Sequence, residues 1–325
     1  MRGNGEIRER AWHLLWQGRW FWKLLGGAIL LNVCSQVVYS VLNGLLYRFG
    51  VFGMTALTNA LEEYAKNRTP LPEITPSLVT QFVSSTALTF FFLFIMASIS
   101  AYGNSALLLR AVDEKNEGWL KAAFGGFAIP LGLAWLFFRM FLIFLFWYVV
   151  ALLPSVAVVG LAITAVPPAL TPHLVAAAVY TLAIVAALCL YVAIMCMPFY
   201  RYRYVFRIKA EHPDWAAGRC IGECAMLTDG SKWRCFVHDC SYWKILLVPL
   251  LLLLFCVAAV CGIVSPAVRQ LFPEGVRVAV AVVGAVVLIV SYLAMFVFAL
   301  IICFYIGVGQ TLLYRDILQE KANQQ

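Results

Sequence analysis

Long apolar runs alternate with short polar segments along the chain, and the length of the runs decides what they form. Predicted spans cover residues 24–47, 77–109, 128–153, 174–198, 245–264 and 276–313. About 20 apolar residues in a helix cross the roughly 30 Å hydrocarbon core of a bilayer. The segment must be helical because lipid offers no hydrogen bonds to an open backbone. The pattern therefore predicts an all-α integral membrane protein, a single polytopic domain over 1–325 with about six transmembrane helices.

An amphipathic segment precedes the first run, over residues 6–18. One helical face carries four apolar side chains: Ile7, Ala11, Leu14 and Leu15. Arg10, His13 and Gln17 lie opposite, so we expect a helix that lies in the cytoplasmic membrane interface. The tryptophans nearby have the spacing of an aromatic belt: Trp12, Trp16, Trp20 and Trp22.

A second cytoplasmic amphipathic segment covers residues 200–243. One predicted helical face carries Ala217, Cys220, Ile221 and Cys224. Pro213 suits the first helical turn and Gly230 a C-terminal cap. Residues 116–127 resemble these two amphipathic segments less closely and are a third candidate. Three such elements indicate three repeats, each an interfacial helix followed by a transmembrane hairpin.

Composition agrees with this class. The chain is 63% hydrophobic and 12% charged, with a mean hydropathy of +0.87, far from the globular norm. Most of the 24 lysines and arginines fall before the first run, after the second and fourth, and after the last. By the positive-inside rule both termini are cytoplasmic. The net charge of +8 then reflects topology and anionic lipid, with no nucleic-acid partner expected.

Residues 199–243, FYRYRYVFRIKAEHPDWAAGRCIGECAMLTDGSKWRCFVHDCSYW, resemble the central motif of a bacterial multi-pass family, domain-of-unknown-function family nine-seven-five. The amino-terminal RERAWHLLWQGRW and the closing Leu313–Ile317 are similar to the ends of that family. The chain departs from the pattern at Leu153-Pro154-Ser155 and at Phe304. The resemblance implies a protein of the bacterial inner membrane and adds no chemistry. It implies a structural role for Glu211, Pro213, Gly230, Lys232, Trp233, Asp239, Ser241 and Tyr314.

Four cysteines and one histidine between residues 220 and 240 raise the question of a metal site. Structural zinc favours Cys-x-x-Cys knuckles, whereas Cys220/Cys224 and Cys235/Cys240 are spaced by three and four residues. In the family pattern these positions hold small or aliphatic residues. We therefore favour apolar packing of unpaired thiols over a metal site, and expect no metal and no cofactor.

Arg139 is the one charged residue that falls inside a predicted span away from its ends. Charge within a membrane marks a functional site by default. The alternative is an interfacial anchor, because span three can begin at Met140 and long side chains reach the headgroups. We favour the anchor.

A basic-aromatic collar follows the fourth run: Tyr200, Arg201, Tyr202, Arg203, Tyr204, Arg207 and Lys209. Arg203 and Arg207 are four residues apart, so on one helix they face the same way and can grip one phosphate. Stacking on a nucleic acid is the alternative. At the cytoplasmic mouth of a span, anionic lipid headgroups are the favoured ligand.

Lys232, Asp239 and Ser241 do not predict catalysis, because no activated nucleophile or acid/base pair is adjacent. We expect Asp239 to pair with Lys232, Arg234 or Lys244.

The favoured function is a non-enzymatic membrane protein that binds anionic lipid, or a membrane-protein partner, through its cytoplasmic helices. The alternative is a small-solute or lipid transporter, using the uncharged polar set Asn32, Gln36, Asn43, Ser98, Ser100 and Asn104. An intramembrane enzyme ranks third.

Overall fold

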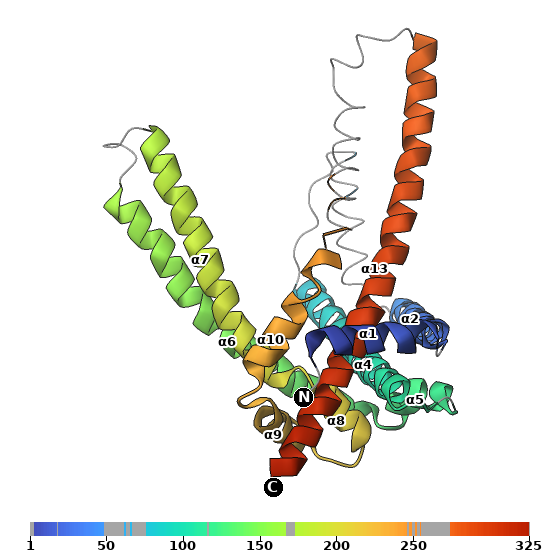
Figure 1. Cartoon of the computed structure of the whole chain (residues 1–325). Helices are drawn as coiled ribbons and strands as arrows, with labels where there is room; N and C mark the ends of the chain where they lie inside the picture. The colour runs from blue at the N-terminus through green and yellow to red at the C-terminus, as the bar shows by residue number, and fades with distance from the viewer. Residues whose placement is uncertain are drawn as a thin grey trace. The chain divides into compact units, whose positions relative to one another are not determined.

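The structure is a computed structural model, and it describes residues 3–17, 19–48, 62, 66, 76–115, 117–166, 173–245, 247, 248, 251, 254 and 274–324 (Figure 1). Within these ranges the secondary structure is helical, with no strand. Five helices are long and apolar enough to cross a membrane, over Trp20–Val41, Thr86–Val112, Pro130–Ala165, Val175–Glu211 and Ile289–Gln324. The all-α prediction is confirmed, with helices over five of the predicted spans. Most of the remaining one, 245–264, lies outside the described residues.

The long helices extend beyond the apolar runs that predicted them. They are α2 (Trp20–Arg48), α4 (Pro76–Val112), α6 (Pro130–Ala165), α7 (His173–Tyr202) and α13 (Glu274–Gln324). An apolar run marks the part of a helix that suits hydrocarbon, whereas backbone hydrogen bonds continue wherever the residues tolerate a helix. For this reason α13 continues well past Leu313. Helix α6 also continues through Pro154, although proline removes one backbone donor.

Contacts divide the chain into two compact units. The first comprises Met1–Leu24, Leu108–Asn116 and Leu227–Gln325, and the second Leu25–Leu107 and Glu117–Met226. Each unit is described by itself.

In the first unit, α1 (Asn4–Trp16) and α10 (Lys232–Cys240) both pack on α13 (Figure 1). The start of α1 is capped by Glu6, whose Oε2 accepts a hydrogen bond of 3.2 Å from the Gly3 N–H. The predicted apolar face of α1 is confirmed, since its four members are all buried: Ile7, Ala11, Leu14 and Leu15. This face of α1 therefore packs in protein.

In the second unit, α6 and α7 form a long hairpin (Figure 1). Next to it, buried residues of α4 and α6 form a core: Met96, Ile99, Tyr102, Ala106 and Leu133. Gly103 lets α4 approach α5 (Trp119–Phe124), because a Cβ there would lie 2.4 Å from the Ala123 carbonyl oxygen. A short 3₁₀ helix, η1 (Gly125–Ala128), then leads into α6.

The predicted cytoplasmic segment 200–243 forms three short helices: α8 (Val205–Glu211), α9 (Ala217–Thr228) and α10. Ala217, Cys220 and Cys224 are buried, which confirms most of the predicted apolar face of α9. Gly230 has φ +78° after α9, a conformation that favours glycine at a helix end. The placement of Pro213 in the first helical turn is wrong, because it lies in the turn between α8 and α9.

Candidate functional site

The basic-aromatic collar does not lie on one helix. Helix α7 ends at Tyr202 and α8 begins at Val205, with Arg203 and Tyr204 in the turn between them. The expectation that Arg203 and Arg207 sit one turn apart on a continuous helix is therefore wrong. Their guanidinium carbons lie 5.3 and 5.2 Å from the centre of the Tyr204 ring, so one buried tyrosine holds both cations.

The residues of the collar also differ in how deeply they are buried. Arg207 is 7% exposed and Lys209 is 5% exposed. The Lys209 Nζ donates to the carbonyl oxygens of Pro213 and Trp215, at 2.5 and 2.6 Å, and so ties α8 to the turn before α9. Arg207 and Lys209 are thus held inside the protein, contrary to their predicted place at the headgroups. Arg201 is exposed, while three collar members are partly buried: Tyr200, Tyr202 and Arg203.

Three exposed arginines lie on α6, α7 and α9, each against an aromatic ring. The guanidinium carbon of Arg139 is 5.0 Å from the centre of the Trp135 ring, and that of Arg201 is 5.7 Å from Tyr202. Arg219 lies 4.0 Å from the ring of Trp215. We call Arg139, Arg201 and Arg219 the exposed arginine set.

Helix α9 lies against the ends of α6 and α7 that carry this set. A Cβ on Gly218 would come within 2.9 Å of an Arg139 guanidinium nitrogen. The Cys224 thiol contacts the Arg201 carbonyl oxygen at 3.4 Å. Arg139 is exposed and lies beside the amphipathic helix α9, a placement that favours the anchor over a buried charge. Apolar side chains exposed on α6 and α7 border the set: Trp135, Phe138, Leu142 and Phe199.

Arg219 was missed by the sequence analysis, which treated it only as a topological charge. A signal was present in the sequence, because Trp215 and Arg219 are four residues apart, a spacing at which a cation can meet a ring. The start of α9 at Ala217 was not predicted, so the pairing had no structural context.

Three of the four cysteines between residues 220 and 240 are interior, and Cys240 is exposed. Cys220 and Cys224 are buried in the second unit, and Cys235 and His238 in the first. Burial raises the pKa of the Cys220 thiol, an effect that the positive charge of Lys209 partly offsets. A raised pKa lowers the thiolate fraction, and the thiolate is the form that binds metal. In the ranges that the structure describes, no three His, Cys, Asp or Glu residues are grouped to hold a metal ion.

Family-motif residues at both ends of α10 make contacts in the first unit. Lys232 Nζ pairs with Asp229 at 3.6 Å, and Trp233 is 72% exposed. Asp239 accepts a hydrogen bond of 3.2 Å from Gln310 on α13, and the Ser241 carbonyl oxygen accepts one of 2.6 Å from Arg8.

The remaining motif residues are interior or lie at a helix end. Tyr314 on α13 is buried, and Glu211 ends α8. Arg234 pairs with Asp316 at 3.8 Å and with Glu320 at 3.1 Å, both on α13.

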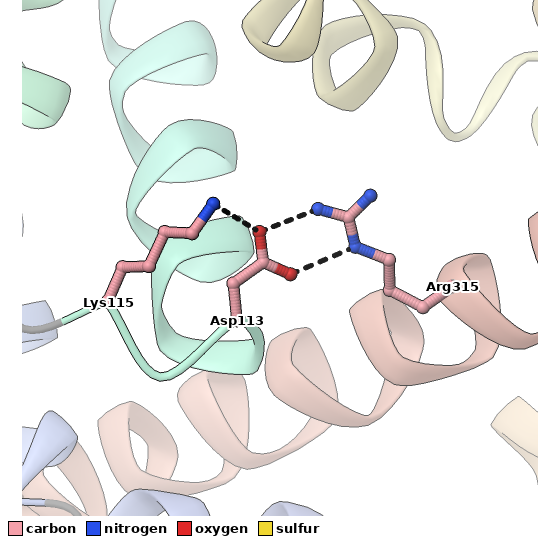
Figure 2. Close-up of polar contacts among 3 residues, drawn as sticks. All are labelled: Asp113, Lys115 and Arg315. Atoms are coloured by element: carbon pink, nitrogen blue, oxygen red, sulfur yellow. Dashed lines mark hydrogen bonds and ion pairs between the residues drawn. The ribbon is translucent and has the colours of Figure 1, made fainter.

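An ion pair that the sequence analysis did not predict joins the end of α4 to α13 (Figure 2). Arg315 donates to both carboxylate oxygens of Asp113, from Nε at 3.1 Å and from Nη2 at 2.8 Å. Lys115 approaches the same carboxylate at 3.9 Å. The two main partners are 202 positions apart, so no local pattern points to the pair.

The polar set considered for transport lies on α2 and α4. Asn32, Gln36 and Asn104 are exposed, and Ser98 donates to the Ile95 carbonyl oxygen of its own helix at 2.7 Å. The side chain of Asn43 lies outside the described residues. No family model, curated protein or solved structure matches the chain.

Proposed function

We propose that the protein is a non-enzymatic, multi-pass protein of the bacterial inner membrane that binds anionic phospholipid through the exposed arginine set. The observation that carries the proposal is the arrangement of Arg139, Arg201 and Arg219, each exposed and each against an aromatic ring beside apolar surface. A site for a lipid headgroup needs cations next to an apolar surface, because the ligand itself is charged at one end and apolar at the other.

The chemistry of the set suits phosphate. A guanidinium presents a fixed fork of donors that binds two phosphate oxygens at once. An aromatic ring beneath it holds the cation in place. Basic residues near an anionic membrane each contribute about 1 kcal/mol of attraction. In this proposal Arg139, which lies farther along the apolar surface, reaches a headgroup while Trp135 stays at the membrane interface.

The wider topology is part of the same proposal. Both termini, residues 110–127 and residues 200–243 lie in the cytoplasm, because the basic residues concentrate there. The chain has six spans arranged as three helix-plus-hairpin repeats, and it belongs to family nine-seven-five. Support for these points comes from the sequence pattern, and the five long apolar helices support only the multi-pass architecture.

The test is native mass spectrometry of lipid retained by the purified protein. The variant Arg139→Gln/Arg201→Gln/Arg219→Gln removes the set and is compared with the wild type in matched detergent. We expect retained anionic lipid to fall several-fold in the variant, and added salt to have the same effect on the wild type.

A matched control removes three other predicted cytoplasmic charges, in Lys115→Gln/Lys121→Gln/Lys232→Gln. Lys115 and Lys232 have side chains that are 69% and 41% exposed. If both triple variants lose lipid equally, retention follows net charge and the proposed site is wrong. Equal retention in the wild type and the arginine variant contradicts lipid binding by the set.

A further inference from the structure

The exposed edge of α1 carries a connected series of aromatic rings. Trp12 and Trp16 are 49% and 38% exposed, and their ring centres are 5.5 Å apart. Trp16 stacks at 4.9 Å on Phe21, which is buried, and Phe21 meets Trp22 edge-on at 5.1 Å, so Phe21 links the three exposed tryptophans from beneath. We call Trp12, Trp16, Phe21 and Trp22 the aromatic edge. It runs from α1 across the turn and into the first turn of α2.

This edge is distinct from the apolar face of α1. Ile7, Ala11, Leu14 and Leu15 are buried against protein and have no surface left for a membrane. Trp20 is also unavailable, because it is 1% exposed and lies 4.8 Å from the Lys23 ammonium. The large apolar side chains that α1 exposes are therefore its tryptophans, beside the exposed polar residues Glu6, Glu9 and His13.

The position of the edge decides what covers it. The apolar helix segment long enough to cross a membrane begins at Trp20, and Trp22 in its first turn is 67% exposed. The edge is thus continuous with the surface of α2 that faces lipid in a membrane. Arg19, exposed, and Lys23, partly exposed, flank the edge with positive charge that suits the phosphate layer. Tryptophan prefers this boundary, because its ring is apolar while its N–H needs a partner.

We propose that the aromatic edge docks on the bilayer interface, so that α1 lies along the membrane surface on its tryptophans and its aliphatic face holds α13. This goes beyond the proposed binding of anionic lipid, since it concerns other residues in the other unit and requires no anionic headgroup. Trp12 also meets Tyr305 of α13 edge-on at 5.6 Å, so the lipid contact and the α13 contact share one ring.

The test labels the full-length protein with 5-fluorotryptophan and places it in nanodiscs of zwitterionic phosphatidylcholine. Trp12→Phe, Trp16→Phe and Trp20→Phe each remove one fluorine line and so assign it. We expect a lipid carrying a spin label near its headgroup to broaden the Trp12 and Trp16 lines strongly. The Trp20 line is the internal control and should broaden least. A water-soluble paramagnetic chelate should broaden the Trp12 and Trp16 lines less than the labelled lipid does.

Two outcomes overturn the proposal. One is broadening of the Trp12 and Trp16 lines by the aqueous chelate with no effect of the labelled lipid. The other is that neither the labelled lipid nor the chelate broadens the Trp12 and Trp16 lines, which indicates that protein covers the edge. If a phenylalanine variant does not fold, Trp12→Tyr or Trp16→Tyr provides the same assignment. Because the nanodiscs hold no anionic lipid, the result is independent of whether the exposed arginine set binds.

Discussion

At the scale of single residues, Gly309 shows how closely α10 fits α13. A Cβ on Gly309 would lie 2.0 Å from the Tyr242 hydroxyl and 3.3 Å from the His238 ring. Tyr242 and His238 are both completely buried, so neither ring has space to move away. We expect Gly309→Ala to lower the free energy of unfolding by about 1–3 kcal/mol, the range for overpacking a core.

The matched control is Gly222→Ala in α9, where nothing lies within 4 Å of the added Cβ. Alanine is the better helix former, so this variant should gain up to about 1 kcal/mol. Reversible unfolding in mixed micelles, followed by circular dichroism, measures both variants. Similar stability changes in the two variants contradict the close fit at Gly309.

The Cys220 thiol should react slowly with alkylating reagents in the folded protein. Burial raises its pKa above the ordinary value of 9.0, so the folded protein keeps the thiol protonated at pH values where the unfolded chain ionises it. Its contribution to stability is therefore complete below pH 9 and falls as the pH rises above it. We expect iodoacetamide at pH 8 to modify the exposed Cys240 quickly and Cys220 only after denaturation, as mapped by peptide mass spectrometry. Equal labelling of the two in the native state contradicts this.

At the scale of elements, the Asp113–Arg315 pair fixes the end of α4 to α13. Both side chains are partly buried, at 27% and 29% exposed, and two hydrogen bonds join them. A double-mutant cycle of Asp113→Asn and Arg315→Gln should give a coupling energy of about 1 kcal/mol or more. Unfolding in mixed micelles provides the four free energies.

The control cycle uses Asp113→Asn with Lys115→Gln. Lys115 is 69% exposed and 3.9 Å away, the kind of pair that contributes roughly 0–1 kcal/mol. A smaller coupling is therefore expected for Lys115 than for Arg315. Equal coupling energies for Asp113–Arg315 and Asp113–Lys115 would mean that the two hydrogen bonds from Arg315 add no stability.

At the scale of the whole molecule, the distribution of basic residues predicts which side of the membrane each loop occupies. Gly3 lies at the start of α1, and Lys66 lies between the first two predicted spans. In a cysteine-free background we expect Gly3→Cys to be protected from an impermeant thiol reagent in intact cells, and Lys66→Cys to react. Permeabilised cells are the control, since both sites should then react. Rapid labelling of Gly3→Cys from outside reverses the proposed topology.

The sequence by itself determined the class of the protein and the faces of its helices. Long apolar runs require helices in lipid whatever the tertiary contacts, and helical spacing placed Ile7, Ala11, Leu14 and Leu15 on one face. Only the tertiary structure decided what that face touches, because protein and lipid are equally apolar neighbours. It likewise decided the end of the collar helix at Tyr202, the burial of Arg207 and Lys209, and the distant partner of Asp113. These depend on contacts between segments far apart in the chain, which local periodicity does not encode.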